Sequence, residues 1–369
     1  MAGIYIHIPF CKSKCRYCDF TSYPGKIGLA DAYMACVYKE MKLRAQELKN
    51  KTFDTVYIGG GTPSVIDPLS IAGCLNMIRA EYDLRKDAEI TIELNPGTID
   101  EQKVAVYRKV GINRFSIGLQ SANDAILADL GRVHTAADFT AACKLLGNVN
   151  KSADIMIGLK NQTVQDIFDA IDLAKAGGAK HISMYALTPE DGTPIYSDYL
   201  NGELPDSDEV ADQYEKAREY LSSLGYMRYE VSNFSLPGYE SRHNLNYWRR
   251  GEYIGFGVSA SSFMCGRRFT NTADLDDYIK CIMTNYYPVV DDEKIEGEDA
   301  KFEMVMLALR TTEGLSLAKY KNAFGTDFPV DFFEPLKKNV RYLSYDNGRV
   351  RIKDEYLYVQ NQILMDFLH

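Results

Sequence analysis

The chain has 369 residues, of which 46% are apolar and 25% charged, and its formal net charge is −9. This composition excludes extensive disorder, and the acidic balance disfavours nucleic acid as a partner because binding it requires a basic face. No apolar run reaches the ~18 residues of a membrane-spanning helix, and the first residues do not resemble a signal peptide. We therefore expect a cytoplasmic protein.

A cysteine loop follows the first predicted element, a β-prone run at residues 4–8. It carries Cys11, Cys15 and Cys18, spaced C-x3-C-x2-C. Three thiolates this close together can bind one soft metal centre. An iron–sulfur cubane usually takes four protein thiolates, so three would leave one iron with an open position. The other five of the eight cysteines are scattered along the chain, and we expect them to be core residues.

Strand and helix patterns then alternate. After a helix at 29–49, strands are predicted at 55–58, 89–94, 114–119, 154–159 and 181–187, followed by helices at 68–82, 100–110, 136–146, 163–176 and 208–224. This order predicts an α/β protein with a parallel sheet and right-handed crossovers. Six strand–helix units are fewer than the eight of a closed barrel, so we predict an incomplete (β/α)6 barrel. A doubly wound open sheet is the alternative, because periodicity does not separate the two.

The pattern changes after residue 226. A strand at 227–234 is followed by an irregular aromatic stretch, and a compact tail has helices at 300–311, 317–323 and 330–342 and a hairpin signal at Asp346-Asn347-Gly348. We predict three units: a partial barrel (1–235), a connecting segment (236–290) and a small winged-helix-like α+β domain (291–369). Residues 292–369 hold 11 Lys and Arg against 14 Asp and Glu, which favours a structural or lid-like role over DNA binding.

Polar residues gather near the carboxyl ends of the predicted strands. Gly59-Gly60-Gly61-Thr62-Pro63 ends one strand, and it lacks the lysine of a phosphate-binding loop, so alone it is a weak signal. Glu93, Gln120 and Asp154 lie at later strand ends, although each alone is typical of a solvated strand terminus. In parallel α/β folds the chemistry lies at this edge of the sheet, which predicts one site that includes the cysteine loop.

The C-x3-C-x2-C loop after a first strand resembles the radical S-adenosylmethionine (SAM) superfamily. The string IHIPFCKSKCRYCDF resembles one branch, which holds oxygen-independent coproporphyrinogen oxidases and HemW-type haem chaperones. The resemblance implies a [4Fe-4S] cluster on Cys11, Cys15 and Cys18, with SAM on its open iron. It implies SAM-binding roles for Tyr5, Tyr17, Gly60, Gly61, Thr62, Glu93, Gln120, Arg132 and Asp154. One departure is Lys160-Asn161, where the family usually has Pro-Gly.

A second string, His243-Asn244-Leu245-Asn246-Tyr247-Trp248, resembles the H-N-x-x-Y-W motif that is associated with haem binding in the chaperones. The resemblance implies haem as a further cofactor, with His243 as its candidate ligand. Without that context, a histidine among aromatic residues is more often a satisfied core residue. The family often has Cys before Arg242-His243, and this chain has Ser241.

Two features separate chaperone from oxidase. The oxidases have a fourth cysteine two residues beyond the third, where this chain has Phe20, and they have an N-terminal extension that is lacking here. The run Gly257-Val258-Ser259-Ala260-Ser261 is closer to the oxidase sequence at this position. We give it less weight than the missing cysteine and extension. We expect a chaperone that delivers haem to acceptor apoproteins; the alternative is a coproporphyrinogen III oxidase that performs radical oxidative decarboxylation. Whether the protein is an enzyme stays open. We expect no transmembrane segment, although the sequence is compatible with a peripheral contact to a membrane. It does not indicate an oligomeric state.

Overall fold

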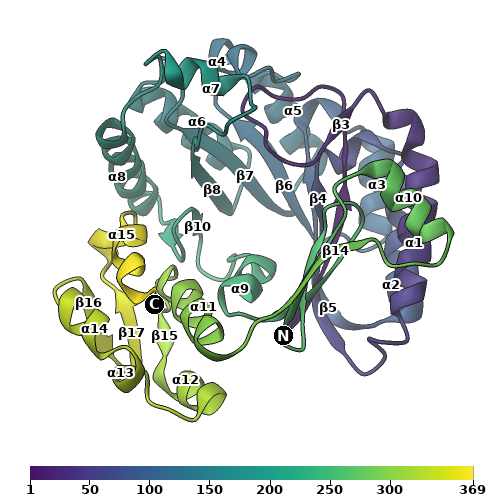
Figure 1. The fold of residues 1–369 in the computed structure, drawn as a ribbon. Helices are drawn as coiled ribbons and strands as arrows, with labels where there is room; N and C mark the ends of the chain where they lie inside the picture. Colours follow the sequence, from purple (N-terminus) through teal and green to yellow (C-terminus); the bar gives the residue numbers. More distant parts are fainter. Residues whose placement is uncertain (369) are drawn as a thin grey trace.

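A computed structural model describes residues 1–368. Its centre is a curved sheet of twelve strands whose order is β14-β13-β12-β11-β1-β4-β5-β6-β7-β8-β10-β9 (Figure 1). Its parallel strands are β11 (Glu252–Phe256), β1 (Ala2–Ile8), β4 (Thr52–Gly60), β5 (Asp83–Leu94), β6 (Arg114–Gln120), β7 (Asn150–Ile157) and β8 (His181–Ala186). Within the described residues the two ends of this sheet do not pair, which confirms the incomplete barrel.

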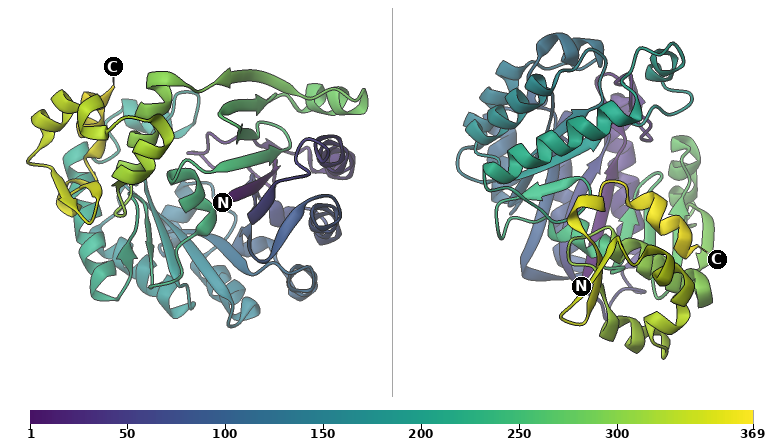
Figure 2. Two further views of the ribbon diagram at one scale, coloured as in Figure 1. Left: turned by 90° about the horizontal axis from the view of Figure 1, so that it is seen from below. Right: turned by 90° about the vertical axis from the view of Figure 1, so that its left-hand side faces the viewer.

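Helices cover the outer face of the curved sheet (Figure 2). They are α1 (Ala30–Arg44), α2 (Pro68–Glu81), α3 (Glu101–Lys109), α5 (Ala136–Leu146), α6 (Val164–Ala176) and α8 (Ser207–Ser223). The short helices α4 (Asp124–Asp129) and α7 (Ile195–Leu200) lie instead at the top of the view in Figure 1, beside the cysteine loop. The starts of the outer helices are encoded locally: Thr135, Thr163 and Asp206 each form a capping box at the first turn of α5, α6 and α8. The first helix ends at Arg44 rather than at residue 49.

Strand β6 shows how the sequence divides the two faces of the sheet. Phe115, Ile117 and Leu119 are buried in the core cluster that includes helix residues. Alternate residues of a strand point to opposite faces, so Arg114, Ser116, Gly118 and Gln120 face the hollow inner side, where they line a cavity. The inner face of a partial barrel therefore carries the polar residues of the chain's otherwise apolar strands.

Segment 236–290 contributes strands and helices of its own, besides connecting the units. Between α8 and the C-terminal part, the elements besides β11 are β9 (Met227–Arg228), β10 (Asn233–Ser235), α9 (Arg242–Trp248), β12 (Ser261–Met264), β13 (Arg267–Asn271), α10 (Leu275–Met283) and β14 (Val289–Lys294). Strand β11 lies parallel beside β1, and β12, β13 and β14 extend that edge antiparallel. The strand predicted at 227–234 is split into β9 and β10, which form an antiparallel pair.

The C-terminal part forms a small α+β unit with its own hydrophobic cluster, which includes Leu309, Tyr320 and Phe332. Its elements are α11 (Gly297–Leu309), β15 (Leu315–Ser316), α12 (Leu317–Phe324), α13 (Phe328–Asp331), α14 (Phe333–Asn339), β16 (Leu343–Asp346), β17 (Arg349–Ile352) and α15 (Gln360–Leu364). Helices α13 and α14 together take the place of the third predicted helix, and the hairpin β16–β17 follows them as predicted. The exact domain boundaries stay a prediction.

Along residues 1–368, every helix is too short or too polar to cross a membrane.

Candidate functional site

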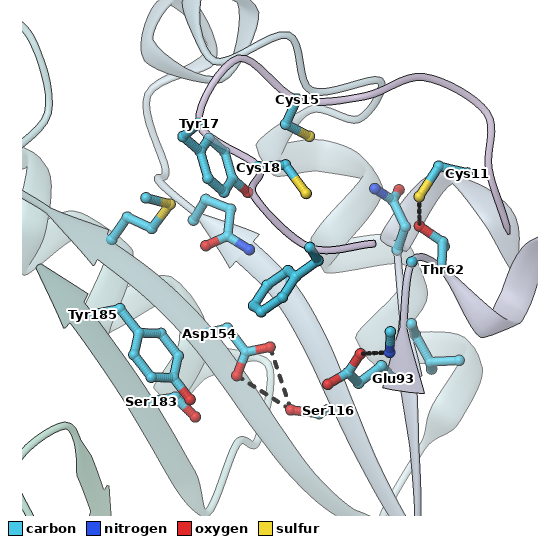
Figure 3. Close-up of a pocket in the computed structure, with 18 of the residues that line it drawn as sticks. Cys11, Cys15, Tyr17, Cys18, Thr62, Glu93, Ser116, Asp154, Ser183 and Tyr185 are labelled. Atoms are coloured by element: carbon cyan, nitrogen blue, oxygen red, sulfur yellow. Dashed lines mark hydrogen bonds between the residues drawn. The ribbon is translucent and has the colours of Figure 1, made fainter. Parts of the chain in front are cut away.

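A cavity of about 510 Å³ occupies the inner side of the partial barrel. The cysteine loop lies at one end of this cavity, and α9 contributes Asn244 at its lining. Figure 3 shows Cys11, Cys15, Cys18 and Tyr17 together, with Glu93, Asp154 and Ser116 deeper in the cavity. Most residues predicted at strand ends therefore meet in one place, as the parallel topology requires.

The cysteine loop is held against the barrel by Arg16. Its guanidinium donates two hydrogen bonds to Asp198, at 2.9 and 2.7 Å, and a third to Asp129 at 2.9 Å. The backbone of Arg16 also bonds to Leu130 and Ile195. Bidentate arginine–carboxylate pairs fix geometry, so this residue sets the position of the three thiols that surround it in sequence.

The glycine run allows the closest approach between strand β4 and the cysteine loop. A Cβ on Gly61 would lie 2.8 Å from the Phe10 carbonyl and 2.9 Å from Cys11 Sγ, distances that side-chain carbons do not tolerate. Gly60 has φ +114°, a conformation that only glycine adopts readily. Thr62 completes the turn, with its hydroxyl 3.5 Å from Cys11 Sγ.

Two carboxylates face the cavity without a hydrogen-bonded cation. Glu93 accepts hydrogen bonds from the Tyr57 hydroxyl at 2.8 Å and from Gly60 N at 3.2 Å. Asp154 accepts from the Ser116 hydroxyl at 3.2 and 3.3 Å. Burial raises the pKa of Glu93 to about 7 and the pKa of Asp154 to about 6. Both side chains are therefore poised to accept a polar or cationic ligand.

Arg132 supplies the positive charge beside the cysteines. It donates hydrogen bonds to Gly118 O at 3.0 Å, to the Tyr17 hydroxyl at 3.5 Å and to Cys15 Sγ at 3.6 Å. Its buried Nε has no protein partner. Gln120 lies nearby with φ +67°, after a register shift at the end of β6. This left-handed backbone is unusual for glutamine, and such strain is typical of binding sites.

Two predicted residues do not line the cavity. Tyr5 lies behind Tyr57, with ring centroids 6.3 Å apart, and its hydroxyl is 3.0 Å from His7 Nδ1. His243 is 1% exposed on α9, and its ring stacks on Tyr57 at 5.1 Å. Both ring nitrogens of His243 have partners, Thr55 Oγ1 at 2.8 Å and the Tyr247 hydroxyl at 2.8 Å. Burial lowers the pKa of His243 to about 3, so its imidazole is neutral.

Several cavity residues were not predicted. They include Tyr57, Thr91, Arg114, Ser116, Ser152, His181, Ser183 and Tyr185, together with Phe20. Most of them occupy every second position of strands that read as continuous apolar runs, such as Ser116 in RFSIGL. Polar residues at a period of two inside a buried parallel strand are the signal that could have identified them.

The departure at Lys160-Asn161 leaves the turn after β7 intact. Asn161 adopts φ +57°, the left-handed conformation that glycine would otherwise supply. Asp154 keeps its place on β7.

The donor set fits an iron–sulfur cluster. Cys11, Cys15 and Cys18 are free thiols, each partly exposed to the cavity. Among residues 1–368, no three Cys, His, Asp or Glu side chains gather closely enough to hold a single metal ion. A cluster with several irons binds each thiolate through a different iron and therefore suits three thiols that stand apart. Arg132 and Thr62 are placed to donate to the sulfurs of Cys15 and Cys11.

The chain was compared with known proteins. Residues 5–174 match the model of the radical SAM superfamily, and residues 295–361 match the HemN C-terminal domain. Heme chaperone HemW of Lactococcus lactis subsp. lactis (strain IL1403) is 32% identical, over 99% of this chain and 96% of that protein. Heme chaperone HemW of Bacillus subtilis (strain 168) is 33% identical over 91% and 90%, and that of Escherichia coli (strain K12) 35% over 84% and 83%.

Among solved structures, coproporphyrinogen III oxidase (HemN) from Escherichia coli matches with a TM-score of 0.87 at 20% identity, over 99% of this chain and 89% of that one. This likeness shows a shared fold. Radical SAM membership brings with it a [4Fe-4S] cluster and SAM as cofactors. The relatives named above are more than 30% identical over most of this chain, which assigns it to one family within the superfamily. This chain belongs to the HemW family of the radical SAM superfamily.

Proposed function

We propose that this protein is a cytoplasmic haem chaperone, which binds haem and transfers it to acceptor apoproteins. The observation that carries the proposal is the similarity to heme chaperone HemW of Lactococcus lactis, which spans 99% of this chain. Phe20 supports it, because the resembling oxidases have a cysteine at that position. The likeness to the oxidase concerns the fold and does not carry the oxidase activity to this chain.

We propose that Cys11, Cys15 and Cys18 ligate the cluster and that the other predicted cavity residues hold SAM. A cluster held there would supply one-electron chemistry next to SAM. The protein's own contribution is electrostatic: Arg132 faces Cys15 and keeps a free Nε for an anionic group of the ligand. Glu93 and Asp154 offer carboxylates to its hydroxyl and cationic groups. Tyr5 acts from behind Tyr57, by supporting that ring.

We propose His243 as an iron ligand that becomes available only when α9 moves. Its neutral imidazole has the lone pair that ligation requires. Its Nε2, however, is engaged with Tyr247 and its Nδ1 with Thr55. Haem binding through this residue therefore needs at least one of these hydrogen bonds to break, and α9 is a helix of only two turns that can shift as a unit.

We also propose a peripheral membrane contact at the segment between α10 and β14. Met283, Tyr286 and Val290 are 62%, 71% and 69% exposed there. The acidic Asp291 and Asp292 follow, so we expect neutral rather than anionic lipid to bind. Flotation with phosphatidylcholine vesicles checks this: the wild type should float partly and a Tyr286→Ser, Val290→Ser double variant less, whereas equal flotation would reject the contact.

Haem titration and transfer test the proposed function. Protein with its cluster reconstituted is titrated with haem, and the loaded protein is then mixed with apomyoglobin as a probe acceptor. We expect saturable binding that His243→Ala weakens, followed by transfer to the acceptor. A chain that binds no haem, or that never releases it, would contradict the proposal. His134→Ala is the matched control, because His134 is also buried but lies outside the haem motif.

A further inference from the structure

The cavity continues below the residues that we assign to SAM. Residues Arg114, Ser116, Gly118 and Gln120 of β6 all line it. Gln120 lies six steps along the strand from Arg114, which corresponds to a depth of about 20 Å. Glu93, Gln120, Arg132 and Asp154 account for the upper and middle part. The bottom, which we call the lower chamber, is lined by Thr91, Arg114, Ser152 and His181, and none of these has a role in the proposed function.

Two buried polar groups in the lower chamber have no partner. Arg114 has a side chain that is 2% exposed, and its Nη2 makes no hydrogen bond. Thr91 is 0% exposed, and its hydroxyl makes none either. The two residues are register partners on β5 and β6, so their side chains lie next to each other on the inner face. An unpartnered guanidinium edge and hydroxyl are costly to bury, which indicates that a ligand completes them.

The charge of Arg114 is only partly balanced by the protein. Its Nη1 donates to Tyr239 O at 3.0 Å, and the nearest carboxylate, Glu89, stands 3.9 Å away, beyond hydrogen-bonding distance. Glu89 uses its other oxygen to accept from His243 N. His181 does not compete for a ligand, because its two nitrogens are taken by Ser152 and Tyr229 at 2.7 Å each. The Nη2 of this cavity-lining residue therefore remains without a hydrogen-bond partner.

We propose that the lower chamber is a binding subsite for a carboxylate group, held by Arg114 Nη2 and the Thr91 hydroxyl. Two adjacent donors match the two oxygens of one carboxylate. A phosphate is disfavoured, since its larger charge would face Glu89 and Asp154 with a single guanidinium to balance it. The carboxylate is not that of SAM, which in the resembling superfamily chelates the open iron at the other end of the cavity. The proposal goes beyond haem transport and does not depend on it.

The carboxylate has two possible sources, a small free acid or a propionate arm of a porphyrin. The first arm of the test measures the melting temperature in about 100 mM sodium propionate, with equal sodium chloride and propionamide as references, because a ligand that binds only the folded state raises it. We expect a rise of about 1–2 °C with propionate alone. The second arm compares titrations with haem and with haem dimethyl ester, which lacks free carboxylates.

Three variants make the test specific. Arg114→Gln should abolish the propionate effect and any preference for haem over its ester. Thr91→Val should weaken both several-fold without loss of folding, because its hydroxyl has no partner to lose. Arg79→Gln, an exposed residue of α2, should change neither. A propionate effect alone identifies a small acid, and an ester effect alone identifies the porphyrin. If neither effect appears, or if Arg114→Gln and Thr91→Val leave them unchanged, the subsite is overturned and the chamber holds water only.

Discussion

The two distinctive motifs of this chain lie in different settings of the same barrel. The cysteine loop, at the carboxyl ends of the strands, borders an open cavity and leaves thiols, carboxylates and Arg132 Nε without complete partners. The side chain of His243 lies against Gly3 and Thr55, near the amino ends of β1 and β4. There both of its ring nitrogens have hydrogen-bond partners, Thr55 and Tyr247. The cavity at the cysteine loop can therefore accept a ligand as it stands, whereas ligation through His243 requires its hydrogen bonds to break. A motif in the sequence therefore does not by itself reveal whether its site is open.

The largest effect is expected from removal of the thiols. A Cys11→Ala, Cys15→Ala, Cys18→Ala triple variant should lose the iron–sulfur absorption band completely after reconstitution. Among the described residues, no other group of Cys, His, Asp or Glu side chains could replace these ligands. The matched control replaces Cys36, Cys74 and Cys265, which lie outside the cavity. A band that persists in the first variant would remove the cluster from the account.

The next test concerns the close contact between the glycine run and the cysteine loop. Gly61→Ala should displace the loop, since its Cβ would meet Phe10 O and Cys11 Sγ below 3 Å. We expect a loss of about 1–3 kcal/mol in the free energy of unfolding and poorer cluster retention. Gly28→Ala is the control, because a Cβ there meets nothing within 4 Å. Equal behaviour of the two variants in denaturant titrations would show that the contact is not required.

The buried His243 gives a test in which the variant should gain haem affinity, whereas the preceding variants should lose function. Tyr247→Phe removes the partner of His243 Nε2 and should make this nitrogen easier to ligate. One neutral hydrogen bond contributes about 1 kcal/mol, so haem affinity should rise about fivefold in an absorbance titration. Tyr253→Phe is the control, because Tyr253 packs against Tyr247 and makes no contact with His243. Weaker haem binding by Tyr247→Phe would mean that the intact motif, and not a released His243, binds haem.

The last test concerns the open carboxylates, whose effect is confined to a pH window. Burial raises the pKa of Glu93 from its ordinary value of 4.5 to about 7 in the folded protein. The unfolded chain therefore loses its proton first, and the stability that Glu93 contributes at low pH is lost as pH rises between about 4.5 and 7. Glu93→Gln should be more stable than wild type by on the order of 2 kcal/mol above that window and by little below it. Denaturant titrations from pH 4 to 8 check this, with exposed Glu101→Gln as reference; a difference that does not vary with pH would contradict it.

Much of the fold could be predicted because its determinants are local. The strand run RFSIGL and the helices predicted at 136–146 and 163–176 are found within one residue of the expected bounds. Strand β11 could not be placed beside β1, because its five residues follow an irregular segment and pair with the start of the chain. That pairing is a long-range contact with no local signal.

The site was predictable to the same degree. Glu93, next to the carboxyl end of β5, was found because parallel topology brings strand ends together, whereas Asp154 lies inside β7 and was identified through the family motif. Arg114 and His181 were missed because they begin their strands and lie at the bottom of the cavity. The burial of His243 was also unpredictable, since it results from Thr55 and Tyr57 of a distant strand. The roles of Arg114 and His181 and the burial of His243 depend on how deep these residues lie in the barrel. The order of residues along the chain does not give that depth.

The central claim is that this chain carries haem and is not a porphyrinogen oxidase. The most direct measurement incubates the cluster-reconstituted protein anaerobically with coproporphyrinogen III, SAM and a reductant, beside a haem titration of the same preparation. The account predicts saturable haem binding and no protoporphyrinogen IX. Formation of protoporphyrinogen IX above the level of the triple cysteine variant would contradict it.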